Sequence, residues 1–291
     1  MASYDAPTSV RMAAFRPCLA LAPYITEIYA YEIPASAQLS TPGALTLLPD
    51  GFPTMCFLYG DTLKAEHGER TWLMRSAICG FQGRPMRMSC AGFAAGLTVR
   101  FVPWGLACFM PESLEDAAHC RLDCRDVFAR SAVEGLESEL FDLPTLLARV
   151  RRVEAFLLAR LRPQATDRLV QQVVRGILQG DGARGIRAMA SDAGASERTL
   201  ERRFRRAIGV PPKGFSRVTR LQSALRHREQ TGSWAESAID AGYYDQAHLI
   251  RDAQEIFGVT PQTVAAPTQN DLAQGFQSLA RDTALDSQIF R

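Results

Sequence analysis

The sequence of 291 residues lacks the hallmarks of several protein classes. It contains no run of about 18 apolar residues, which argues against a membrane-spanning helix and against a membrane partner. Its first residues, MASYDAPTSVRMAAFRP, include no apolar segment of the kind that a signal peptide needs. We therefore expect a cytoplasmic protein, long enough for two domains that each bury a sizeable core.

The chain also lacks cysteine beyond residue 124, although all seven of its cysteines lie within the first 124 residues. An odd count without a signal peptide argues against a disulfide framework. Cys120 and Cys124 lie four residues apart with His119 beside them, but no second ligand cluster at zinc spacing accompanies them. We interpret the cysteines as ordinary buried thiols. The sequence thus predicts no metal site, no cofactor and no catalytic residues.

The net charge of +2 conceals a strong asymmetry along the chain. Residues 184–230 hold twelve Lys and Arg against four Asp and Glu, which is a net +8, and the remainder carries −6. By contrast, residues 233–264 carry a net −4. A basic segment on an otherwise acidic chain favours nucleic acid or another anionic surface as its partner.

The most basic stretch, SERTLERRFRRAIGVPP at 196–212, has the periodicity of an amphipathic helix. One face collects the apolar side chains of Leu200, Phe204, Ala207 and Ile208. The opposite face collects the arginines Arg198, Arg202 and Arg205. Because stacked guanidiniums repel one another, the helix gains nothing from them alone. The pattern therefore indicates an anionic partner outside the helix.

Residues 1–161 are expected to be β-rich before they become helical. The turn signal PDG at 49–51 precedes the apolar run PTMCFLYG, and GLTVRFVP at 96–103 is typical of a strand. Residues 143–161 predict a helix in which Arg149, Arg151, Arg152 and Arg160 form a polar side. Its apolar strip, which we expect to pair two chains into a homodimer, comprises Leu146, Leu147, Val150, Val153 and Leu157.

Residues 167–265 are helical throughout and contain an internal repeat. DAG at 192–194 recurs 48 residues later, and GVPP at 209–212 recurs as GVTP at 258–261. Each copy consists of a short helix, a glycine turn, a longer helix and a stop, which is a helix-turn-helix. Ser196 and Ser233 are predicted N-caps, as is Thr166 or Asp167 for the preceding helix. A connecting helix of roughly 17 residues, about 26 Å long, joins the copies.

This repeat, which ends in GYYDQAHLIRDAQEIFGVTP, resembles the DNA-binding domain of the AraC/XylS family of bacterial transcription regulators. The segments ASDAG and RFRRAIGVPPKGF also carry the resemblance, whereas Ala253 stands where the family usually has Phe. In the N-terminal half, LLPDG and TVRFVPWGL resemble a less studied family of regulator domains. The resemblance implies a transcription regulator, an activator or a repressor, that binds double-stranded promoter DNA and bacterial RNA polymerase, either with or without a small-molecule effector.

Carried over to this sequence, the family's base-reading positions fall on both recognition helices. They are Arg198, Glu201, Arg202, Gln246, Ala247, His248, Ile250 and Arg251. The arginines expected to contact phosphate are Arg203, Arg205, Arg206 and Arg217. An arginine reads guanine through a bidentate hydrogen bond. Glu201 either accepts from a cytosine amino group or simply pairs with Arg205, four residues on.

The N-terminal half leaves several alternatives open. Its aromatic residues either line an effector pocket or fill a core; they are Trp72, Phe81, Phe93, Phe101 and Trp104. This half either senses a small molecule, only dimerises, or contacts other proteins. An enzyme fused to the DNA-binding part is disfavoured because neither His67 nor His119 has a recognisable nucleophile partner. A further alternative is a protein-interaction module that has lost DNA binding. Only the net negative charge of the second unit supports it.

These patterns predict an α+β protein with two domains. Residues 1–161 form a β-rich, barrel-like regulatory and dimerisation domain with trailing helices, and residues 162–166 form a linker. Residues 167–265 form the two helix-turn-helix units, and residues 266–291 form a C-terminal tail.

Overall fold

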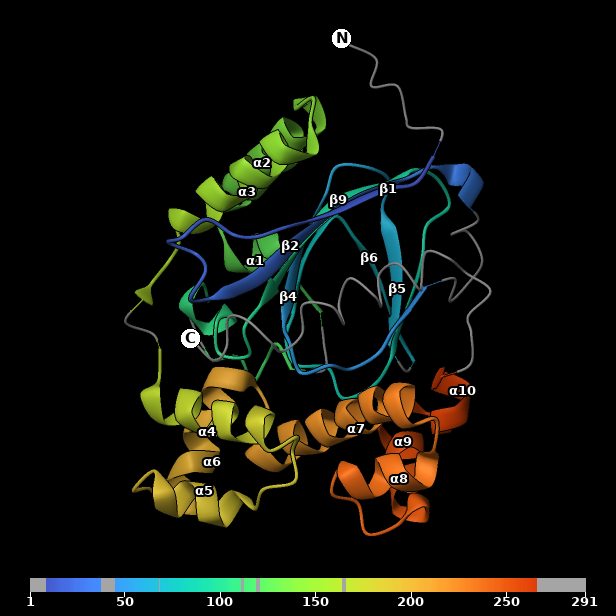
Figure 1. The fold of residues 1–291 in the computed structure, drawn as a ribbon. Helices are drawn as coiled ribbons and strands as arrows, with labels where there is room; N and C mark the ends of the chain where they lie inside the picture. The colour runs from blue at the N-terminus through green and yellow to red at the C-terminus, as the bar shows by residue number, and fades with distance from the viewer. Residues whose placement is uncertain are drawn as a thin grey trace.

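The structure is a computed structural model that describes residues 9–37, 45–67, 69–110, 113–118, 121–163 and 166–265. A β-rich region is followed by a helical region, as the sequence predicts (Figure 1). His119, Cys120 and the C-terminal tail lie outside the described residues. None of the described helices is long and apolar enough to cross a membrane.

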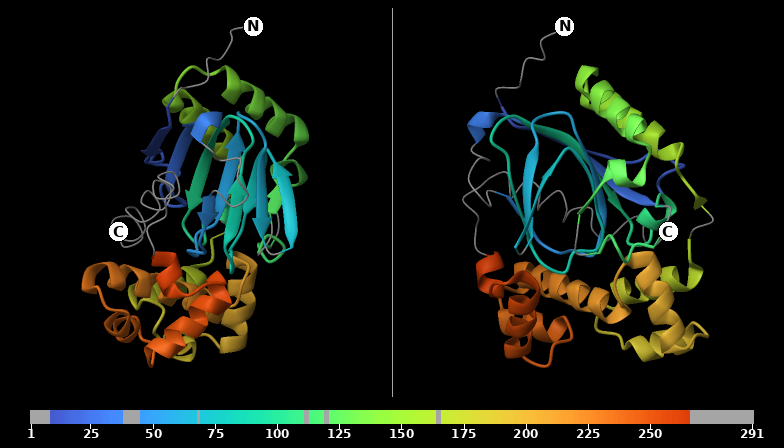
Figure 2. Two further views of the ribbon diagram at one scale, coloured as in Figure 1. Left: turned by 90° about the vertical axis from the view of Figure 1, so that its right-hand side faces the viewer. Right: turned by 180° about the vertical axis from the view of Figure 1, so that it is seen from behind.

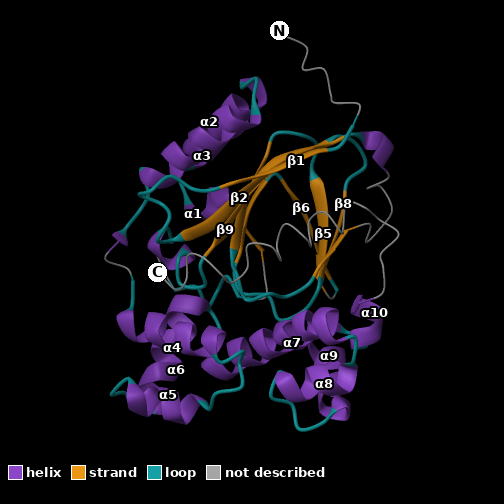
Figure 3. Ribbon diagram, in the orientation of Figure 1, coloured by secondary structure: helices purple, strands orange, loops and turns teal. Residues whose placement is uncertain are grey.

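The β-rich region contains two antiparallel sheets (Figure 3). The larger has the order β1-β2-β9-β4-β7-β10, with strands at Arg11–Phe15, Ile25–Ile33, Ala94–Phe101, Thr54–Leu58, Ser76–Cys79 and Arg121–Asp123. The smaller has the order β3-β8-β5-β6, with strands at Leu45–Leu47, Met86–Ser89, Leu63–His67 and Arg70–Met74. No described strand pairs across the two sheets, so the barrel-like domain is a pair of sheets that does not close.

The larger sheet is covered on both faces. Every residue of β2 is buried, although its sequence ITEIYAYEI includes two glutamates. One face packs against the smaller sheet through a cluster that contains Tyr31, Leu58 and Met86. The other face packs against helices α1, α2 and α3, which span Cys124–Val127, Arg130–Asp142 and Leu146–Leu158 (Figure 2).

Helix α3 corrects the prediction for residues 143–161. The helix forms, with Thr145 as its N-cap, but much of its apolar strip faces its own chain. Val150, Val153 and Leu157 are buried in the core beneath the larger sheet. The physical reason is that this face of the sheet is apolar and has to be covered. Leu147 and Leu158 remain exposed at opposite ends of the helix.

Arg149 also departs from the prediction, because it does not belong to a solvated polar side. Its side chain is buried, and its Nη1 lies 2.8 Å from Oε1 of Glu32 on β2. Its Nε donates to the carbonyl oxygen of Leu140 at 2.8 Å. The glutamate thus tolerates burial in β2 because a buried arginine from α3 compensates its charge.

The helical region contains the two predicted helix-turn-helix units. Its helices α4 to α10 span Arg168–Gln179, Ile186–Asp192, Glu197–Ile208, Pro212–Thr231, Trp234–Asp240, Gln246–Phe257 and Pro261–Ala265. Helices α5 and α6 form the first unit, α8 and α9 form the second, and α7 connects them. The side chains of Ser196, Ser233 and Asp167 cap helices at the predicted positions. With 20 residues, α7 is about 30 Å long, slightly longer than expected.

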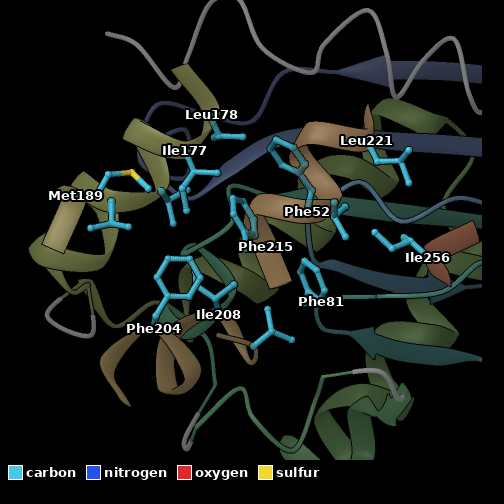
Figure 4. Packing of buried hydrophobic residues seen from close by; sticks show 14 of the residues in the cluster. Phe52, Phe81, Ile177, Leu178, Met189, Phe204, Ile208, Phe215, Leu221 and Ile256 are labelled. Carbon is cyan, nitrogen blue, oxygen red and sulfur yellow. The ribbon is translucent and has the colours of Figure 1, made fainter. Parts of the chain in front are cut away.

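The two regions share one hydrophobic core. Helix α7 runs beneath the open ends of the sheets (Figures 1 and 2). Near its start, Phe215 is completely buried, and its ring centroid lies 6.1 Å from that of Phe81 and 5.9 Å from that of Phe204 (Figure 4). Phe52 of the β-rich region belongs to the same cluster. Phe215 therefore joins the β-rich region to helix α6.

Candidate nucleic-acid interface and cavity

Helix α6 presents the arginine-rich surface predicted from the sequence. Its N-cap Ser196 accepts a hydrogen bond at Oγ from the backbone N–H of Thr199, 3.2 Å away. Leu200, Phe204, Ala207 and Ile208 are buried on its inner face. Burial of this face fixes the rotation of the helix and turns the arginines outward.

The charged side chains of α6 fall into two groups, those that pair with another side chain of the protein and those that have no described partner. Glu201 pairs with Arg205 at 2.9 Å, which is the structural alternative foreseen for that glutamate. Arg203 donates two hydrogen bonds to Asp167, at 2.6 and 2.7 Å, and this interaction raises the pKa of the Arg203 side chain. Arg198, Arg202 and Arg206 are exposed, and no described side chain pairs with their guanidiniums. These three are available to an outside anion.

Arg217, predicted to contact phosphate, is instead held within the protein. Its Nη2 lies 2.8 Å from Oδ1 of Asp252 and 2.6 Å from Oε2 of Glu255. The hydrogen bonds from Glu255 and Asp252 raise the pKa of Arg217 further above its ordinary value. Arg220 also reaches Asp252, at 3.3 Å. Two of the five acids of the second unit are therefore neutralised by the connecting helix, a long-range pairing that charge counting along the sequence misses.

Helix α9 presents a less basic surface than α6. Asp245 caps it by accepting from the backbone N–H of His248 at 2.7 Å. Of the residues predicted to read bases, Ala247 and Arg251 are exposed, whereas Gln246, His248 and Ile250 are half-buried. Tyr244 immediately precedes the cap and is 91% exposed. The sequence signal for Tyr244, a second aromatic residue in the turn, is too weak to mark it as functional.

The C-terminal end of α6 is bound to the β-rich region. The backbone N–H of Leu114 donates to the carbonyl oxygen of Arg206 at 2.9 Å. The next turn, at Gly209, has a φ of +96°, and a Cβ there would lie 2.7 Å from the carbonyl oxygen of Leu114. Glycine is thus required both by the backbone conformation and by the close approach of the β-rich region.

A cavity of about 230 Å³ lies between the two sheets and the helical region. Its walls combine both sheets with helices α4 and α7, and include Tyr29, Tyr31, Ile33, Phe52, Met86, Met88, Leu178 and Leu225. Cys56 and Cys79 also line it, and burial raises the pKa of Cys56 to about 11. No group of described residues forms a metal site.

The aromatic residues proposed from the sequence do not line this cavity. Phe101 is buried on the opposite face of the larger sheet. Phe81 and Trp104 belong to the core shared with the helices, and Trp72 packs against the smaller-sheet cluster. Phe93 lines a separate, more open hollow near α2. Of the two alternatives left open by the sequence, most of these aromatic residues therefore follow the second and fill cores.

The cavity wall contains an ion pair between a buried arginine and a half-buried aspartate that sequence reasoning missed. Arg100 on β9 is 2% exposed, and its Nη2 lies 2.8 Å from Oδ2 of Asp50 in the PDG turn. Its guanidinium carbon lies 3.6 Å from the ring centroid of Phe52. Arg121 also lines the cavity and donates from Nε to the sulfur of Met86 at 2.9 Å. In the sequence, the sign of this ion pair is a single arginine inside the apolar strand GLTVRFVP.

Comparisons with known proteins agree with this division of the chain. A family model described as a helix-turn-helix domain matches residues 189–266, which span most of both units. A second model, described as a domain of unknown function (DUF6597), matches residues 13–123 in the β-rich region. No curated protein matches the chain.

The solved structures that match the chain do so at low sequence identity and low TM-score. ToxT from Vibrio cholerae is 8% identical with a TM-score of 0.45, and the match covers 88% of this chain and 97% of that one. ToxT from Vibrio cholerae bound to an unsaturated fatty acid is 10% identical with a TM-score of 0.43, covering 90% and 96%. The AraC-like transcriptional activator CuxR is 14% identical with a TM-score of 0.22, covering 78% and 88%. The family models thus give the chain a helix-turn-helix domain at residues 189–266, preceded at residues 13–123 by a domain from a family without an assigned function.

Proposed function

We propose that this protein is a sequence-specific DNA-binding transcription regulator in which α6 provides most of the operator contacts. The observation that carries the proposal is the outer face of α6, where Arg198, Arg202 and Arg206 have no partner among the described side chains. Three exposed guanidiniums on one helix repel one another in the absence of an anion. A DNA major groove supplies both phosphates and guanine acceptors for them.

The division of roles follows from the positions of these arginines. Arg198 and Arg202 lie in the first two turns of α6, the part of a recognition helix that meets base edges. Arg206 lies one turn further on and is suited to phosphate. Glu201 is paired with Arg205, so we assign it a structural role. On α9, the exposed Ala247 and Arg251 are the residues best placed to reach bases.

The two recognition helices are proposed to read one face of the DNA. Helix α7 is about 30 Å long, close to the roughly 34 Å that separates successive major grooves. Each chain would then protect two adjacent major grooves. A footprint limited to one groove per chain would contradict this arrangement.

The direct test measures affinity for a fragment of the protein's own promoter region by gel shift. Arg202→Ala is expected to weaken binding by about 1–3 kcal/mol and to relax the base preference at one position. Arg203→Ala is the matched control, because Arg203 is a neighbour on the same helix but is engaged by Asp167. Equal losses from both variants would contradict the proposal, since they would report only the net charge of the helix.

Pairing of two chains is proposed to involve the exposed side of α3. Leu147 and Leu158 are exposed on this helix and are eleven residues apart, which places them on one face. Sedimentation of the full chain tests this, with Leu147→Glu/Leu158→Glu expected to give a monomer. A variant that remains dimeric would remove α3 from the interface.

The β-rich region is proposed to sense a small molecule rather than only to dimerise. The support is the cavity, which is largely apolar and carries a few charged groups, as ligand sites do. Its walls include α7, the helix that connects the two helix-turn-helix units. A ligand in the cavity would therefore contact a helix of the DNA-binding region.

A further inference from the structure

The turn before α9 contains one residue that the first unit lacks. Ala195 and Tyr243 occupy equivalent places in the two units, because each donates its backbone N–H to the carbonyl oxygen five residues earlier, at 2.9 and 2.8 Å. In the first unit the N-cap Ser196 follows at once. In the second unit Tyr244 intervenes before the N-cap Asp245. Tyr244 is therefore an insertion between helices that otherwise match.

The fold fixes the backbone around this insertion but does not bury its side chain. Tyr243 is 4% exposed, and its ring centroid lies 5.1 Å from that of His248 and 4.5 Å from the guanidinium carbon of Arg220. A hydrophobic residue immediately before an N-cap often packs on the residue four positions after the cap, which here is Leu249. Tyr244 is 91% exposed, so it does not serve that structural role.

The first turns of the two recognition helices present opposite chemistry. Counted from the N-caps, Ala247 on α9 occupies the position of Arg198 on α6, and both residues are exposed. The ring of Tyr244 and the carboxylate of Asp245 lie just before this turn of α9 and are also exposed. A carboxylate repels phosphate, whereas a ring and a methyl group favour an apolar contact. The leading end of α9 thus offers apolar groups where α6 offers a guanidinium.

We propose that Tyr244 is a specificity-determining residue whose ring, together with the methyl group of Ala247, packs on the C5-methyl group of a thymine. That methyl group is the apolar feature of the major groove, and apolar side chains contact it. The N-terminal end of a recognition helix is the part that meets base edges. The inference rests on the proposed function and deepens it, because the first unit then selects guanine and the second selects thymine.

The experiment begins with selection of binding sites by the full chain from a random library of DNA duplexes. The unaltered chain is expected to enrich sites with a thymine about ten base pairs, or one helical turn, from the guanine whose selection Arg202→Ala relaxes. Tyr244→Ala should keep the guanine and lose the thymine. Tyr244→Phe retains the ring and should keep both. The matched control Val259→Ala removes an exposed apolar side chain just beyond the opposite end of α9 and should also keep both.

Replacement of the selected thymine by uracil isolates the methyl group, because the two bases pair identically. The loss of one buried methyl group should weaken binding by the unaltered chain about fourfold. Tyr244→Ala should weaken binding to the thymine duplex about five- to tenfold, and uracil should then cost this variant less than about twofold. Because Tyr244 is exposed, the urea midpoint of the variant should equal that of the unaltered chain.

Three results would overturn the assignment of Tyr244 while leaving the regulator intact. They are selected sites that contain guanine but no thymine one helical turn away, losses from Tyr244→Ala and from uracil that simply add, and a loss in Tyr244→Phe as large as that in Tyr244→Ala. The last result would assign the hydroxyl group to a phosphate instead. A library from which the chain enriches no sequence would overturn the proposed function, and with it the reading of thymine by Tyr244.

Discussion

The two helix-turn-helix units are built alike but present different surfaces. Both recognition helices have 12 residues, a side-chain N-cap and a left-handed glycine at the C-cap. On α6 three arginines lack described partners, whereas α9 exposes Arg251, Ala247 and the preceding Tyr244. The comparison shows that the two copies share their fold and helix caps, whereas net positive charge is confined to the first copy.

The units also differ in what holds them. The first is bound to the β-rich region at two points. The backbone N–H of Leu114 donates to the carbonyl oxygen of Arg206 near the end of α6, and Phe215 near the start of α7 packs against Phe81. The second is held mainly by α7, where Arg217 and Arg220 engage Asp252. A change in the β-rich region therefore reaches the first unit directly. We infer that the first unit anchors and regulates DNA binding and that the second refines it.

The largest expected effect on stability comes from Phe215→Ala. Phe215 is fully buried and contacts both Phe81 and Phe204, so the substitution should lower the free energy of unfolding by about 3–5 kcal/mol. Urea unfolding followed by tryptophan fluorescence measures it. A loss below about 1 kcal/mol would mean that the shared core does not join the regions as described.

The glycines at the C-caps give a matched pair of smaller substitutions. Gly209→Ala combines a left-handed backbone with a Cβ close to the Leu114 carbonyl oxygen, so we expect a loss of roughly 2–5 kcal/mol. Gly258→Ala has the left-handed backbone but no atom within 4 Å, and should cost about 1–2 kcal/mol. The same urea titrations compare the two. Equal losses would show that the contact of α6 with the β-rich region does not constrain the helix.

Much of the helical region could be predicted because its determinants are local. The caps Ser196, Ser233 and Asp167 and the apolar face of α6 follow from spacing of a few residues. The partners of Arg217 and Arg149 could not be predicted, since they lie 35 and 117 residues away. The lining of the cavity was missed for the same reason, because Asp50 and Arg100 meet only once the sheet has formed.

The smallest predicted effect concerns the salt dependence of DNA binding. Arg206 is exposed and proposed to contact phosphate, so Arg206→Ala should reduce the slope of log K against log salt by about 0.9. Arg217→Ala removes the same charge from an arginine already paired with two acids and should leave the slope nearly unchanged. The measurement is a titration of promoter fragment at several salt concentrations. The opposite ranking would indicate that Arg217 exchanges its partners for phosphate.

The central claim is that the first unit dominates DNA affinity, and a comparison of Arg202→Ala with Arg251→Ala on one promoter fragment tests it most directly. Both arginines are exposed residues of a recognition helix, so the pair controls for charge and position in the fold. We predict a loss of about 1–3 kcal/mol for Arg202→Ala and a clearly smaller loss for Arg251→Ala, because Arg202 is proposed to read a base from the basic unit, whereas Arg251 lies on a unit of net charge −4 that repels DNA. A larger loss for Arg251→Ala would contradict the account.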